Sequence, residues 1–381
     1  MEIENHKQMM QRDEGLITEI LLRLPVKSLV RFKAVCKFWR SLISDPHFAT
    51  SHFERAAPRL LIRTDHGIRT MDLEESLHPD RISELIDYDF PYTVPYIVGS
   101  CRGFLLIGYD RGRSLSIWNP STHVHKPLPV DANAYEYDHM YPYEYGFGYD
   151  SSKDDYLVVR VPGVKPGSST NFADVQFFSL RTNIWKYTES VDLPSSLAST
   201  KGADLPTFTT VPDHSVGLLF NEAIHWVAQN FVAGRVTHFI IAFDLMEKRL
   251  LEIPQPKPDD LLPQPDDLFP QGFLFYRLWV HGRFFSLTAF QQDTIEIWVM
   301  KKYKVQSSWT KTLVVLSSKL LYPLCSTKGG DIVMCSGINL TKYSDEGLQG
   351  DQLENFDHFG LVNESVPLYT ESMLSLPDVS G

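Results

Sequence analysis

The chain has 381 residues, 43% hydrophobic and 22% charged, with a formal net charge of -11. This composition is typical of folded globular proteins and excludes a largely disordered chain. The acidic balance argues against a general nucleic-acid-binding surface, because neutralising phosphates requires an excess of Lys and Arg. The length predicts one large and one small domain, since single cores stop growing near about 250 to 300 residues.

The N-terminus and the cysteines indicate the compartment. No signal peptide or bilayer-spanning apolar stretch is present in the sequence, so we expect a protein of the cytosol or nucleus that does not insert into a membrane. The four cysteines, Cys36, Cys101, Cys325 and Cys335, include no CxxC pair. Such sparse cysteines predict neither a disulfide scaffold nor a zinc module, and we expect no metal or cofactor.

The first predicted element is an amphipathic helix that begins after Asp13 and ends before Pro25. Three shorter helices are predicted over residues 28–35, 37–43 and 47–55, with a break at Asp45 and Pro46. The first helix has its apolar residues at i, i+3 and i+4 spacing: Leu16, Ile17, Ile20, Leu21 and Leu24. So small a helical unit buries little of its own surface, which favours a contact with a partner protein.

This segment resembles the F-box. The matching residues are Leu24-Pro25, Val35-Cys36-Lys37, Trp39-Arg40, Leu42-Ile43 and Pro46 with Phe48. The resemblance implies docking to a Skp-type adaptor, and through it to a cullin and a RING protein. The adaptor contact is then expected at nine residues: Leu16, Ile17, Ile20, Leu21, Leu24, Pro25, Leu29, Val35 and Trp39.

One departure from the family pattern concerns the start of the F-box. Members usually open with a further Leu-Pro pair, and this chain has Arg12-Asp13 in that position. Because the family pattern places that pair against the adaptor, its loss puts the strength of docking in question.

Beyond residue 60 the pattern changes to short apolar runs separated by turn residues, which is typical of strands. One element recurs, a strand with an aromatic or apolar residue before a polar turn, at Met71, Trp118, Phe178, Phe243 and Trp298. Each interval is long enough for a three- or four-stranded sheet, so we predict a distorted β-propeller, with an antiparallel β-sandwich as the alternative. Residues 366–376 alternate and are predicted to close the ring against the segment near Leu60.

These later segments resemble the F-box-associated domain of plants, a relative of Kelch-type propellers. The resemblance rests on runs such as residues 99–104, 118–122, 145–150 and 369–373. It implies a small all-α F-box followed by a large all-β domain. The expected boundaries are a flexible N-terminus at 1–13, the F-box at 14–56, the F-box-associated domain at 57–376 and a tail at 377–381.

The resemblance implies a non-catalytic receptor that brings an unidentified protein substrate to a ubiquitin ligase. Tyr141 and Tyr143, in a Tyr-rich stretch, are the predicted substrate contacts, although such a stretch also suits a loop that covers the sheets. The usual local signatures of hydrolases, zinc proteases and nucleotide-binding proteins are absent from the sequence. Two alternatives stay open: an F-box scaffold without ligase function, and a β-domain that is an enzyme or binds a small ligand or sugar.

Overall fold

The computed structural model describes the helical N-terminal part and most of the strands that follow. The described residues are 14–64, 67–72, 95–109, 114–129, 144–161, 175–188, 207–208, 216–232, 235–257, 275–291, 293–317, 321–336, 339–343, 351–355, 361–362 and 368–377.

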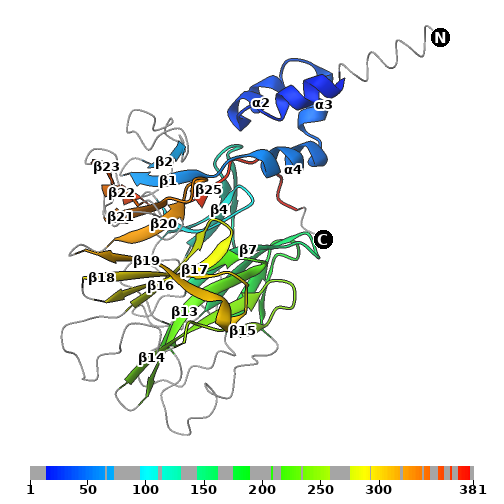
Figure 1. The fold of residues 1–381 in the computed structure, drawn as a ribbon. Coiled ribbons are helices and arrows are strands. Elements are labelled where there is room, and N and C mark those ends of the chain that lie inside the picture. Colours follow the sequence, from blue (N-terminus) through cyan, green and yellow to red (C-terminus); the bar gives the residue numbers. More distant parts are fainter. Residues whose placement is uncertain are drawn as a thin grey trace.

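The described chain begins with four helical segments, which lie at the upper right of Figure 1. They are residues 14–21, α2 (Val26–Phe32), α3 (Lys37–Ile43) and α4 (Pro46–Arg55). The α3 bounds agree with the prediction. Helix α2 lies earlier in the chain than the predicted 28–35, because the extended Pro25 starts it and residues 33–35 form a turn.

Side-chain caps fix where α3 and α4 begin. The Asp45 carboxylate accepts hydrogen bonds from the amides of His47 at 2.8 Å and Phe48 at 3.1 Å, which satisfies donors that the helix itself leaves free. The Cys36 Sγ accepts a longer hydrogen bond, 3.5 Å, from the amide of Trp39. These caps separate the short helices sharply enough for them to fold back on one another.

The described residues from Arg59 onward form six antiparallel sheets, the blades of a β-propeller. The first holds β1 (Arg59–Thr64), β2 (Gly67–Asp72), β24 (Leu361–Val362) and β25 (Leu368–Tyr369). The second holds β3 (Tyr96–Cys101), β4 (Phe104–Tyr109), β5 (Ser114–Asn119) and β6 (Val124–Pro127), and the third holds β7 (Glu144–Asp150), β8 (Asp155–Val161), β9 (Gln176–Ser179) and β10 (Ile184–Tyr187). The fourth holds β11 (Thr207–Phe208), β12 (Leu218–Phe220), β13 (Ala223–Val232), β14 (Arg235–Asp244) and β15 (Leu250–Ile253). The fifth holds β16 (Phe275–His281), β17 (Phe284–Gln291), β18 (Thr294–Met300) and β19 (Trp309–Leu316), and the sixth holds β20 (Tyr322–Ser326), β21 (Ile332–Ser336), β22 (Asn339–Tyr343) and β23 (Asp351–Asn355).

The propeller prediction is confirmed, and the β-sandwich alternative is wrong. Four of the five residues of the predicted repeat, Trp118, Phe178, Phe243 and Trp298, lie on the third strand of their four-strand path, in β5, β9, β14 and β18. All four are at least nine-tenths buried. The fifth, Met71, does not follow this rule, because it lies on β2 at the end of the strand order of the first sheet. The repeat pattern did not include the sixth sheet, whose third strand, β22, carries the buried Leu340 and Tyr343.

The ring closes through the first sheet, where the start and the end of the β-domain meet. Strand β25 pairs with β1, with Tyr369 opposite Arg59 and Leu368 opposite Leu60. Figure 1 shows the red β25 beside the blue β1. This pairing confirms the predicted closure near Leu60 and locks the propeller with backbone hydrogen bonds from both ends of its sequence.

Candidate functional site: the helical domain and its seat on the propeller

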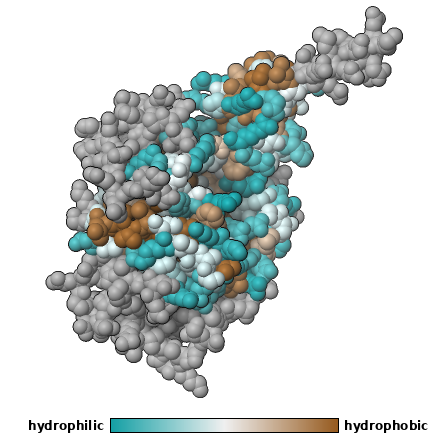
Figure 2. Space-filling model, viewed as in Figure 1, coloured by the Kyte–Doolittle hydropathy of each residue, from teal (hydrophilic) through white to brown (hydrophobic). Residues whose placement is uncertain are grey.

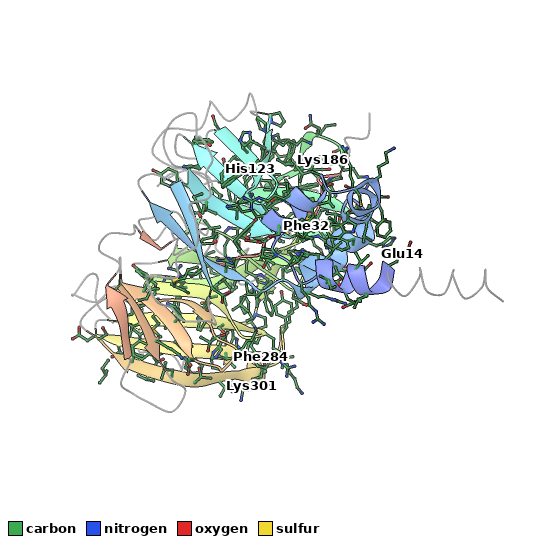
Figure 3. All side chains as sticks on the ribbon, turned by 90° about the horizontal axis from the view of Figure 1, so that it is seen from above. Glu14, Phe32, His123, Lys186, Phe284 and Lys301 are labelled. Atoms are coloured by element: carbon green, nitrogen blue, oxygen red, sulfur yellow. The ribbon has the colours of Figure 1, made fainter. Side chains whose placement is uncertain are left out.

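The helical domain and the propeller share one hydrophobic core. Leu21, Val26 and Leu29 of the helices are buried in the same cluster as Phe104 and Tyr156 of the second and third sheets. In Figure 3 the helix that bears Phe32 lies on the side of His123 and Lys186, away from Phe284 and Lys301 of the fifth sheet. A shared core of this kind fixes the orientation of the helices relative to the propeller.

The C-terminal segment, residues 370–377, fills the space between the two parts. Met373 and Leu374 are buried in the shared core, and the fully buried Asn119 donates a 3.0 Å hydrogen bond to the carbonyl of Ser372. The Glu371 carboxylate accepts a 3.3 Å hydrogen bond from the amide of Val26, at the positive N-terminal end of α2. The segment therefore holds both the propeller and the helical domain.

A tight turn lies directly beneath this segment. Arg102 and Gly103, between β3 and β4, both have positive φ values of 50° and 79°. A Cβ atom on Gly103 would collide with Ser372, so only glycine allows the C-terminal segment to cross here.

Arg102 joins the same turn to the helical domain. Its guanidinium lies 4.2 Å from the ring centroid of Tyr149 in β7 and 5.9 Å from that of Phe53 in α4. Burial, together with the hydrogen bond to Asp154, raises the pKa of Tyr149 to about 12, so this ring stays neutral and keeps its face available to the cation.

Two polar contacts connect the first helix and the turn that follows it to α4. A ring nitrogen of His52 lies 2.8 Å from the carbonyl oxygen of Leu24, and Arg55 forms a 2.9 Å ion pair with Glu19. The Arg55 hydrogen bond lowers the pKa of the Glu19 carboxyl. Both partners of the ion pair are about half exposed, so it orients the helices more than it stabilises them.

A second set of apolar side chains on the helices has no cover from the described chain. Leu16 and Ile20, one helical turn apart, are 63% and 52% exposed. Val35 is 61% exposed, and Val30 and Phe38 are 43% and 41% exposed. Figure 2 shows brown, apolar atoms gathered on the helical part of this face of the molecule. We call Leu16, Ile20, Val30, Val35 and Phe38 the docking face.

Positive charge surrounds the docking face. Residues 20–44 contain six Lys and Arg and no Asp or Glu, although the whole chain has a net charge of -11. Arg23, Lys27, Arg31, Lys37 and Arg40 are all exposed. An apolar face with a basic surround favours a partner that is apolar where it binds and acidic around that contact.

The structure separates the nine residues predicted at the adaptor contact into three groups. Leu16, Ile20, Val35 and Pro25 are exposed, whereas Ile17, Leu24 and Trp39 are partly buried. Leu21 and Leu29 are buried in the shared core, 1% and 0% exposed. The Trp39 ring packs against Phe32, with ring centroids 5.2 Å apart, and so joins α3 to α2.

Two members of the docking face, Val30 and Phe38, were absent from the sequence prediction. Val30 follows the buried Leu29 and Phe38 precedes the partly buried Trp39, so each points about 100° around its short helix from a residue that packs inward. The apolar signal was present in both helices. Periodicity over seven residues is too short to show which side faces the propeller.

The predicted substrate contacts Tyr141 and Tyr143 lie outside the described residues. Within the described ranges, no three His, Cys, Asp or Glu side chains are grouped to hold a metal ion. No helix in that part of the chain is long and apolar enough to cross a bilayer.

A cleft of about 620 Å³ separates the helices from the first sheet. Its lining contains charges of both signs, with Arg23, Arg55 and Arg59 around the same space as Asp72 and Glu371. This balance favours neither an anion nor a cation.

A helical domain with an uncovered apolar face, seated on a closed propeller, defines a binding protein of two parts. Comparison with known families agrees with that description. Residues 13–50 match the F-box domain, and residues 60–335 match the F-box associated beta propeller domain. The chain belongs to the family of F-box proteins that carry an F-box-associated propeller.

Curated relatives in Arabidopsis thaliana support the same assignment. "F-box protein CPR1" is 29% identical, over 80% of this chain and 73% of its own length. "F-box/kelch-repeat protein At3g23880" is 28% identical, over 79% of this chain and 78% of its own. Among solved structures, a chain of a nidogen/laminin complex matches with a TM-score of 0.42 at 9% identity, covering 82% of this chain and 97% of that chain, a likeness too loose to support an inference.

Proposed function

We propose that this protein is the substrate-recognition subunit of a Skp-cullin-F-box ubiquitin ligase, acting in the cytosol or nucleus. Its F-box docks a Skp-type adaptor, and its propeller holds a protein substrate. The observation that carries the proposal is the docking face, five large apolar side chains on the F-box that are each at least 41% exposed. Clustered exposure of this kind marks a protein interaction site.

The adaptor contact consists of the docking face, with Pro25, Ile17, Leu24 and Trp39 at its margin. Leu21 and Leu29 act from beneath, since their side chains hold the helices on the shared core. Burying a Leu, Ile or Val side chain contributes about 1.5 to 3 kcal/mol, so a few of these residues supply most of a stable contact. The basic surround speeds association and orients the partner.

The protein performs no chemistry of its own in this proposal. It raises the effective concentration of substrate lysines near the charged ubiquitin-conjugating enzyme, and the shared core keeps the distance and angle between the two bound proteins fixed. Tyr141 and Tyr143 remain predicted substrate contacts, to be tested by replacing both with Ala and measuring substrate capture.

Co-purification of the intact chain with a Skp adaptor and a cullin tests the proposal. We expect the double variant Leu16→Asp, Ile20→Asp to bind the adaptor at least about a hundredfold more weakly, because two apolar contacts are lost and two charges are desolvated. Both side chains are more than half exposed, so the thermal unfolding temperature should not change. The matched control is Val124→Asp, an exposed apolar residue of β6 on the propeller, which should bind like the wild type.

A second arm of the experiment restores the family pattern. Replacing Arg12 and Asp13 with Leu and Pro should strengthen adaptor binding if the missing pair weakens it. Adaptor binding by neither the wild type nor the restored chain would refute the proposal. Adaptor binding without recovery of the cullin would favour a scaffold over a ligase subunit.

A further inference from the structure

The outer strand of each propeller sheet has one free backbone edge, and proteins usually protect such edges against strand addition. Strand β6 is protected by Pro127. The amide of Leu128 donates to Leu115 at 2.9 Å, so Leu128 faces β5 and Pro127, one residue earlier, occupies an outward position that has no N–H to offer.

Two other outer strands are protected in different ways. Strand β10 is only four residues long and carries an exposed Lys186. Strand β15 has Leu250 and Ile253 buried, and its end is covered where the Trp309 indole donates a 2.8 Å hydrogen bond to the carbonyl of Pro254.

Strand β19 is eight residues long and is protected over its first half only. The register with β18 shifts between Ile297 and Trp298, which leaves Thr312 as the extra residue of a bulge. Lys311, just before the bulge, forms a 2.6 Å ion pair with Glu296. After the bulge, Leu313–Leu316 has no charge and no proline, and no described strand pairs with its outer side.

The unprotected half of β19 is also an apolar surface. Leu316 is 79% exposed, the highest value among the large apolar side chains that the structure describes. Figure 2 shows a brown patch in the region that Figure 1 labels β19.

The backbone of this half-strand points toward solvent at two positions. Ser317 donates its amide to the carbonyl of Asp293 at 2.8 Å, so Ser317 faces β18. Along an antiparallel pair of strands, residues that hydrogen-bond to the neighbouring strand alternate with residues whose backbone groups point away from it. The register from Thr294↔Leu316 to Ile297↔Leu313 contains no shift, so this alternation continues without interruption from Ser317 back to Leu313. The N–H and C=O groups of Val314 and Leu316 therefore point away from β18, on the side where no described strand pairs with β19.

We propose that Leu313–Leu316 docks an uncharged, extended segment of a partner protein, which adds as a strand to the outer edge of the fifth sheet. As a statement about the substrate, this rests on the proposed receptor role. Charge selects the segment, because Leu313–Leu316 carries no charged side chain and Lys311, before it in β19, is paired with Glu296, so the described strand offers an acidic or basic peptide no unpaired charge. Area argues against a second copy of the chain, since four paired residues bury far less than the roughly 800 Å² per partner of a stable dimer.

The test uses fluorescence anisotropy of labelled peptides with the full-length chain. The probe is a Thr-Val-Thr-Val-Thr-Val peptide, and its matched control is Thr-Glu-Thr-Glu-Thr-Glu. We expect saturable binding of the first peptide only. Val314→Pro should weaken it about tenfold or more, because an outward N–H is lost. Leu316→Lys should also weaken binding of the first peptide, and it leaves the backbone N–H groups in place. This second variant tests the proposal even if Val314→Pro does not fold.

Tyr187→Lys, at an exposed position of β10, is the control variant and should bind like the wild type. Absence of peptide binding by the wild type, or equal binding of the Glu peptide, would overturn the proposal. Concentration-dependent dimers in sedimentation that Val314→Pro abolishes would assign the edge to a second copy instead. Adaptor co-purification with the same variants separates the two ideas, since it should persist even if strand addition fails.

Discussion

The helical domain has two apolar faces, and they differ in what covers them. The inner face, with Leu21, Val26 and Leu29, is buried against the propeller and the C-terminal segment. The docking face carries residues of the same kinds, yet each is at least 41% exposed. One small domain therefore has a contact within the chain and an exposed apolar face that we propose for a partner.

Removing the C-terminal segment should have the largest effect, because it uncovers the inner apolar face of the helical domain. A chain that ends at Thr370 loses Met373 and Leu374 from the shared core and the Glu371 carboxylate from the start of α2. We expect a loss of at least about 4 kcal/mol in stability, with the helices unfolding separately from the propeller. Calorimetry and hydrogen exchange at α2 measure both effects.

A chain that ends at Pro377 is the control for this truncation, because it keeps every described residue. It should show a single transition at the wild-type temperature. A single unshifted transition in the shorter chain as well would contradict the role assigned to the C-terminal segment.

Substitutions at two neighbouring residues of α2 should distinguish the inner face from the docking face. Leu29→Ala is expected to lower the free energy of unfolding by about 2 to 5 kcal/mol, because it opens a cavity in the shared core. Val30→Ala, one residue later and 43% exposed, should change it by about 0.5 kcal/mol or less while weakening adaptor binding. Urea unfolding and adaptor titration of both variants provide the measurement. Equal destabilisation by the two substitutions would show that the faces are not distinct.

Lowering the pH should reduce the stability of the propeller and, through the shared core, that of the helices. Burial lowers the pKa of His225 from 6.5 to about 4, and the ring lies between the Tyr303 hydroxyl at 2.6 Å and the Leu218 carbonyl at 3.2 Å. The unfolded chain binds a proton below pH 6.5 where the folded chain does not, so the stability from a neutral His225 is present above pH 6.5 and is lost as the pH falls toward 4. This amounts to about 2 kcal/mol at pH 5.

The variant His225→Gln should therefore lose less stability between pH 7 and pH 5 than the wild type. If the helices and the propeller are one cooperative unit, hydrogen exchange at α2 should report the same acid-induced loss. If hydrogen exchange at α2 is the same in the wild type and in His225→Gln at low pH, the shared core does not couple the two parts.

Local sequence signals were sufficient to predict the elements in which those signals agree with the folded surroundings. Capping and proline positions predicted four helices, an irregular repeat of aromatic or apolar strand residues predicted the propeller, and the alternating residues 366–376 predicted its closure near Leu60. These signals are local or repeated, so they survive without knowledge of the fold. The repeat did not extend to the sixth sheet, whose third strand β22 carries the buried Leu340 and Tyr343, and the number of sheets was not predicted.

Which apolar residues of the helical domain are exposed could be seen only in the folded structure. Leu16 and Leu21 lie on one predicted helix and are chemically identical, yet one is 63% exposed and the other 1%. Leu21 is buried in the shared core, which includes propeller residues and Met373 and Leu374 of the C-terminal segment. That segment is more than 340 residues away in sequence from α2, where the Glu371 carboxylate accepts a hydrogen bond from the amide of Val26. A periodic pattern shows that a face is apolar, whereas what covers that face depends on chain segments that meet only in the folded protein.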